Sequence, residues 1–211
     1  MKTALNIVFS VIIVVLVYFL FQSIMEPIRF NKEKDARETA IKERLMDIRT
    51  AQEAFKSVKG YYTSSFDTLI TFLETDSLPL VFKRGALTDE MIAEGITSER
   101  EAVKKGLISR DTSYIPVLDS IFHKESPIEE LRYGPGMENT EFQMSAGRVM
   151  TTSMVMVNVF EAYVRNDVFL SDLDRQLVVN YNEQRTKITG FPGMKVGDVK
   201  IPNNNAGNWE D

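Results

Sequence analysis

The chain has 211 residues, and its 25 basic and 30 acidic side chains give a formal net charge of −5. This mild acidity lacks the basic patch that marks nucleic-acid-binding domains, so no nucleic-acid partner is expected. The absence of cysteine excludes disulfides, thiolate catalysis and cysteine metal sites.

The segment from residue 4 to residue 25 contains no charged side chain, and its centre from Val11 to Phe21 is continuously apolar. A helix of this length reaches about 33 Å, enough to cross a hydrocarbon core of roughly 30 Å. A cleaved secretory signal has a shorter apolar region and a small-residue cleavage site, which residues 22–27 do not supply. We therefore predict an uncleaved transmembrane helix at residues 4–25.

The charges around this segment bear on its orientation. Only Lys2 and the terminal amine precede it, whereas a run of basic residues follows it: Arg29, Lys32, Lys34, Arg37, Lys42 and Arg44. Basic residues concentrate on the cytoplasmic side of membrane segments, so this count favours a cytoplasmic soluble domain.

Residues 26–58 are predicted to form an amphipathic stalk helix that Gly60 ends. Pro27 lies at its start, where a proline kinks or interrupts a helix. Ile41, Leu45 and Ile48 begin an apolar stripe that Phe55 and Val58 continue.

Two interpretations of this stripe are open. Phe55 and Val58 are expected to pack on the chain's own sheet. The upstream residues Ile41, Leu45 and Ile48 suit a partner helix about as well as they suit intramolecular packing, and they form the candidate partner-helix interface.

Residues 59–202 are predicted to form an α+β soluble domain, followed by a polar tail at 203–211 that Trp209 can pin. A serine-capped helix is expected to end at Leu73, and Ser171 is expected to cap a later helix. Short polar helices are expected at 89–94 and 98–105, extended segments at 78–83, 107–118, 141–150 and 154–164, and a bent hairpin at 188–199.

We predict no catalytic, cofactor-binding or metal-binding residue. A triad needs groups that converge in space, and the neighbours of the single histidine, His123, are close only in sequence. Asp172 and Asp174 are spaced like the start of a calcium loop, but the glycine and further acid do not follow. An enzyme would need a pair from His123, Glu129, Arg132, Asp172 and Asp174 to converge.

Residues 47–63, DIRTAQEAFKSVKGYYT, resemble the corresponding region of type IV pilins and type II secretion pseudopilins. In that family a membrane helix continues into an amphipathic helix that ends at a glycine beside aromatic residues. A short segment such as Ser65 to Leu73 then precedes an antiparallel sheet. The family's peptidase cleavage site and its early glutamate have no counterpart here. These two departures from the family imply that the helix is retained as an anchor.

The resemblance implies a long N-terminal helix packed on an antiparallel sheet of four or five strands. It also implies a non-catalytic component of an inner-membrane envelope complex for secretion or surface assembly, with a periplasmic soluble domain, against the charge count. Its partners would be the membrane and other envelope proteins or further copies of the chain. The alternative is a tethered periplasmic module that binds a ligand or peptide in a pocket rimmed by Tyr61, Tyr62 and Trp209.

Overall fold

A computed structural model describes residues 2–86, 88, 91–92, 95–96, 98–122, 128–137 and 140–210. Helix α1 (Lys2–Lys59) passes through Pro27 without ending there, so the proline does not interrupt the stalk. Gly60 follows with a φ of 84°, and its amide donates to the Lys56 carbonyl at 2.8 Å. Glycine enters this left-handed conformation without a Cβ clash, which confirms the predicted helix end.

The N-terminal part of α1 is long and apolar enough to cross a membrane. Its most apolar window has a mean hydropathy of 2.2, and none of that window is buried against the rest of the described chain. From Phe9 to Ile24 every side chain is exposed. A helix with apolar side chains all round its surface is suited to a surrounding that is itself apolar.

The C-terminal part of α1 is the central wall of the soluble domain. Ile41, Leu45 and Ile48 are each 0% exposed within the main hydrophobic cluster. These side chains are therefore occupied by intramolecular packing, and the predicted partner-helix interface is not available at these positions. The domain begins close to the apolar segment, because Phe30 already belongs to the same cluster.

The strands form two antiparallel sheets rather than the single sheet that we predicted. In the first, β1 (Ser77–Arg84) pairs with β2 (Ser109–Pro116) along its full length. The second has the order β3-β4-β5, built from β3 (Gln143–Met150), β4 (Met156–Arg165) and β5 (Gly193–Gly197). The first pair extends away from the main cluster and is closed by its own small cluster of Ile96, Ala102 and Ile108.

Short helices connect these sheets. Helix α2 (Phe66–Thr75) starts at Ser65, whose Oγ accepts from the Thr68 amide at 3.4 Å, as predicted for a serine cap. The remaining described helices are α4 (Glu99–Lys104), α5 (Val117–Ile121), the 3₁₀ helix η1 (Ile128–Arg132), α6 (Asn166–Phe169) and α7 (Arg175–Thr189).

Two predictions about the C-terminal third are wrong. The cap of α7 is Asp174, whose Oδ1 accepts from the Leu177 amide at 2.9 Å, and not Ser171. The expected hairpin at 188–199 is instead the end of α7, a left-handed Gly190 and the single strand β5. The following segment returns to the domain, where Gly207 bridges to Val196 and Trp209 packs against the main cluster.

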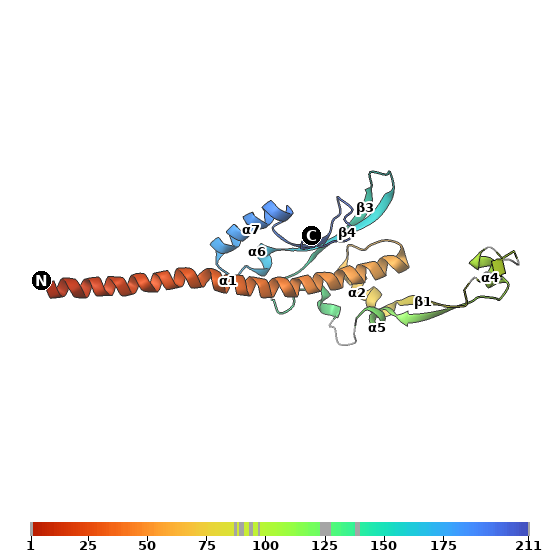
Figure 1. The fold of residues 1–211 in the computed structure, drawn as a ribbon, viewed down its shortest axis with the longest axis horizontal. Coiled ribbons are helices and arrows are strands. Elements are labelled where there is room, and N and C mark those ends of the chain that lie inside the picture. Colours follow the sequence, from red (N-terminus) through yellow and green to blue (C-terminus); the bar gives the residue numbers. More distant parts are fainter. Residues whose placement is uncertain are drawn as a thin grey trace.

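The chain is elongated along α1 (Figure 1). The N-terminal part of the helix stands alone, whereas α7, α6 and the three-stranded sheet lie beside its C-terminal part. The β1–β2 arm, here residues 77–116, extends beyond the end of α1 and carries α4 at its far end. The turn between β3 and β4 projects on the other side of α1 from the arm in this view, near the C-terminal end of the helix.

Candidate functional site

A bidentate ion pair joins α1 to the segment between α6 and α7. The Arg37 guanidinium donates to the Asp172 carboxylate at 2.5 and 2.8 Å and to the Phe169 carbonyl at 2.7 Å. It also donates to Glu33 at 3.1 Å. The hydrogen bonds from Arg37 hold the pKa of Asp172 below its usual value. The segment between α6 and α7 is thereby fixed to the helix a short distance after the apolar region.

A hollow of about 540 Å³ opens beside this pair, with Ala36, Ala40 and Met137 among its lining residues. Arg37 is its basic group, and that charge is already paired with Asp172 and Glu33. The hollow therefore offers an anionic ligand little uncompensated positive charge.

Tyr181 makes a second tie between α7 and α1. Its hydroxyl donates to the Glu38 carboxylate, and the Lys34 ammonium lies 4.6 Å from the centre of its ring. Burial raises the pKa of the Tyr181 hydroxyl, and the Glu38 charge raises it further. The phenol therefore stays protonated and keeps donating at any physiological pH.

The turn after α1 is held by a buried amide. Gln52 is fully buried, and its side chain donates to the Thr63 carbonyl at 2.6 Å and accepts from the Thr63 amide at 3.1 Å. This pair directs the ring of Tyr62 onto Phe160, with ring centres 4.8 Å apart. The helix end is also joined to β4, because the Asn158 amide group donates to the Gly60 carbonyl at 2.7 Å.

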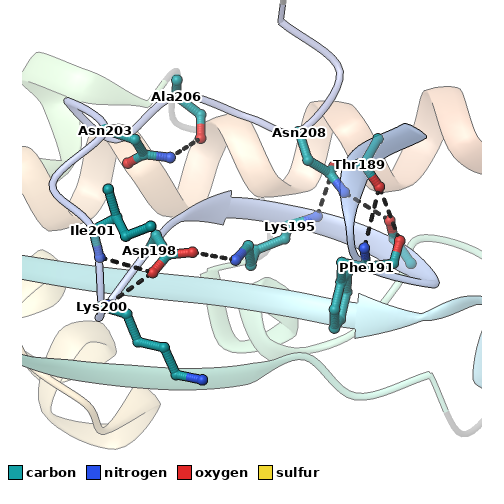
Figure 2. A network of polar contacts seen from close by, with 10 residues as sticks. Thr189, Phe191, Lys195, Asp198, Lys200, Ile201, Asn203, Ala206 and Asn208 are labelled. Atoms are coloured by element: carbon teal, nitrogen blue, oxygen red, sulfur yellow. Dashed lines mark hydrogen bonds and ion pairs between the residues drawn. The ribbon is translucent and has the colours of Figure 1, made fainter. Parts of the chain in front are cut away.

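The C-terminal segment closes the β5 side of the sheet through a polar network (Figure 2). The Asp198 carboxylate accepts from the Lys195 ammonium at 2.5 Å and from the amides of Lys200 and Ile201 at 2.7 and 3.1 Å. Burial alone would raise the pKa of Asp198, but these hydrogen bonds outweigh it and lower the pKa. Asn208 bonds the Lys195 amide and the Gly193 carbonyl. The Asp198 carboxylate and the Asn208 side-chain amide are therefore used in holding the C-terminal segment to β5.

The three aromatic residues expected to rim a ligand pocket lie apart. Tyr62 is buried on Phe160, and its hydroxyl accepts from Asn205 at 2.8 Å. Trp209 is half-buried and lies under the Lys42 ammonium. Tyr61 is half-exposed at a different hollow of about 420 Å³. The hollow at Tyr61 is lined by neither Tyr62 nor Trp209.

Three of the candidate catalytic residues are each engaged by a different partner. Asp172 pairs with Arg37, Arg132 pairs with Asp67, and Asp174 caps α7. Glu129 is exposed on η1, and His123 lies outside the described residues. Among the aspartates and glutamates that are described, no group of three or more is placed to hold a metal ion.

The exposed apolar side chains of the soluble domain gather mainly at its distal end. We call the following residues the distal apolar surface: Tyr61, Leu80, Phe82, Tyr114, Met150, Met154, Val155 and Met156. They belong to the turn after α1, to the arm and to the tip of the β3–β4 hairpin (Figure 1). The sequence predicted extended segments at 78–83, 107–118, 141–150 and 154–164 but did not show which of their apolar side chains stay exposed. The three methionines between residues 150 and 156 were the sequence feature that could have indicated this surface.

Comparison of the chain with protein-family models, with curated proteins and with solved structures finds no match.

Proposed function

We propose that this chain is a non-catalytic, pilin-like component of a cell-envelope complex, and that it acts through protein contacts. In this proposal residues 4–25 anchor it in the inner membrane and the soluble domain lies in the periplasm. The observation that carries the proposal is the single helix α1, which joins a wholly exposed apolar half to a half that forms the wall of the core.

The arrangement around the end of α1 supports the pilin-like part of the proposal. The helix ends at Gly60, the chain turns through Tyr61 and Tyr62, and α2 precedes the antiparallel sheet that packs on the helix. This order is the one that the resemblance at residues 47–63 implies. The β1–β2 arm is an addition to it, inserted between α2 and the main sheet.

The distal apolar surface is where we place the protein contacts. Isolated exposed apolar residues are ordinary, but local groups of them mark interaction surfaces. The arm and the β3–β4 hairpin, which project in different directions from α1 (Figure 1), each carry such a group. The buried stripe at Ile41, Leu45 and Ile48 has no exposed area to contribute.

Because the chain contains no cysteine, single cysteines report on it without background. Cysteine at the exposed Gln184 of α7 tests orientation: a membrane-impermeant maleimide should label it in intact spheroplasts as fully as in lysed ones. Labelling only after lysis would place the domain in the cytoplasm, as the charge count suggests, and would overturn the proposed compartment.

Cysteine at Tyr114 and at Met154 tests the contacts, with Gln184→Cys as the exposed control on another face. In native membranes a thiol crosslinker should link each of these two variants to other envelope proteins or to further copies of the chain. The control should remain monomeric. Monomeric protein at all three positions would contradict a role in assembly.

A further inference from the structure

Three methionines lie within one short stretch at the tip of the β3–β4 hairpin. Met150, Met154 and Met156 are 60%, 83% and 54% exposed. Methionines elsewhere in the domain are covered more: Met194 is buried, and Met137 and Met144 are partly buried. The tip therefore presents thioether groups to solvent, whereas the rest of the domain uses methionine for packing.

The hairpin register brings two of these side chains together. Met150 is the register partner of Met156, so both side chains lie on the same face of the sheet. The next pair outward is bonded, since the Thr151 amide donates to the Val155 carbonyl at 2.9 Å. Hydrogen-bonded and non-bonded pairs alternate, so Met150 and Met156 form a non-bonded pair with Cα atoms about 4.5 Å apart.

The third methionine, Met154, lies in the turn that joins the two strands. The Met154 amide donates to the Thr151 carbonyl at 2.9 Å, and the Thr151 hydroxyl accepts from the Val155 amide at 3.2 Å. Met154 has a φ of 57°, a left-handed conformation that is uncommon for residues other than glycine. Met154 is two residues from Met156 along the chain, at the tip of the same hairpin.

The chemistry of three thioethers selects a particular ion. Methionine sulfur is uncharged, soft and carried on a flexible side chain, and soft thioether ligands select Cu(I) over the hard cations that prefer carboxylate oxygen. We propose that Met150, Met154 and Met156 form a thioether site for a monovalent soft ion, namely Cu(I). This site is independent of the proposed assembly function, although the three residues also belong to the distal apolar surface.

Replacing the tip methionines by leucine distinguishes ion binding from protein contact, because leucine keeps an apolar side chain but lacks the sulfur. The test uses the full chain in detergent micelles with [13Cε]methionine, titrated with Ag(I) as an air-stable probe and with Cu(I) under anaerobic conditions. One ion should bind per chain and should shift three of the ten methionine methyl signals, assigned by single Met→Leu variants.

The triple variant M150L/M154L/M156L should weaken ion binding by about tenfold or more, as changes around a bound metal commonly do. Met137→Leu, away from the tip, should bind like the wild type. Thermal unfolding should be unchanged in the triple variant, because the three replaced tip side chains are exposed. Wild-type affinity in the triple variant, or shifts spread over the other methionines, would overturn the site. Loss of the Tyr114 crosslinks in the same variant would show instead that the sulfurs serve protein contact.

Discussion

The two hydrophobic clusters of the described chain differ in what they lie against. The main cluster packs on one wall, the C-terminal part of α1, and collects residues from α2, α6, α7 and the three-stranded sheet. The second cluster, at the far end of the arm, consists of Ile96, Ala102 and Ile108 with Met91 and Val103 beside them. It is supported by a two-stranded ribbon and the short helix α4.

This difference separates global stability from local stability. A two-stranded hairpin is marginal by itself and depends on what it packs against. The main domain gains its stability from side chains that come together from distant parts of the sequence. We expect the arm to open by itself at lower free energy than the main domain, while the rest of the chain stays folded.

The largest effect is expected from Leu45→Ala in the main cluster. Leu45 is fully buried, so its truncation should lower the free energy of unfolding by about 2–5 kcal/mol. Urea unfolding in micelles, followed by the fluorescence of the single tryptophan Trp209, measures it. Val14→Ala, in the exposed apolar part of α1, should change this value by less than about 0.5 kcal/mol. Equal effects at the two positions would contradict the division of α1 into two halves.

A smaller loss is expected from Gln52→Ala. This change leaves the amide and carbonyl of Thr63 without the partners they have now, and buried unpaired groups cost about 1–3 kcal/mol. Gln184→Ala on the exposed surface of α7 is the matched control and should be neutral. The same urea assay decides between them, and a neutral Gln52→Ala would mean that the turn after Gly60 holds itself.

A pH-dependent effect below about 1 kcal/mol is expected from Asp172→Asn, because the Asp172 side chain is 63% exposed and solvent screens its pair with Arg37. The folded-state pKa of Asp172 is lowered. Its stabilisation is therefore present above the unfolded pKa of about 3.9 and is lost as the pH falls through the folded value.

Thermal unfolding between pH 2 and pH 6 should consequently depend less on pH in Asp172→Asn than in the wild type. The exposed control Glu183→Gln should leave the slope unchanged. A slope equal to that of the wild type in Asp172→Asn would show that the ion pair contributes nothing measurable.

The smallest global effect is expected from Ile108→Ala, although Ile108 is almost completely buried. Its neighbours belong to the arm cluster, so the transition reported by Trp209 should shift by less than about 0.5 kcal/mol. Hydrogen exchange should instead become faster in the β1–β2 arm alone. A global loss as large as that of Leu45→Ala would show that the arm and the main domain unfold together.

Local signals predicted several elements well. Gly60 was expected to end α1 because glycine enters the left-handed conformation easily, and it does so. A serine was expected to cap α2, and Ser65 does. The predicted run at 141–150 contains β3, and the run at 154–164 covers all of β4 except Arg165, because strand patterns are local features of the sequence.

Other features depend on long-range packing that periodicity does not encode. The stripe at Ile41, Leu45 and Ile48 indicated an apolar face, but only the tertiary structure shows that the chain's own domain covers it. The sequence of an extended segment does not show which other strand it pairs with, so the division into two sheets was not predicted. Ser171 and Asp174 are both good caps, and the helix starts at the residue whose oxygen reaches the Leu177 amide.

The passage of α1 through Pro27 has a mechanical consequence. Between residue 26 and residue 59 the helix is about 50 Å long, and it continues without a break into the apolar half. In the proposed anchored arrangement one continuous helix joins the soluble domain to its anchor. A rotation of the helix about its long axis would turn the arm through the same angle, and an axial shift of one turn would move the distal end by about 5.4 Å. Movements of the helix in the bilayer would in this way be transmitted to the partner bound at the distal end.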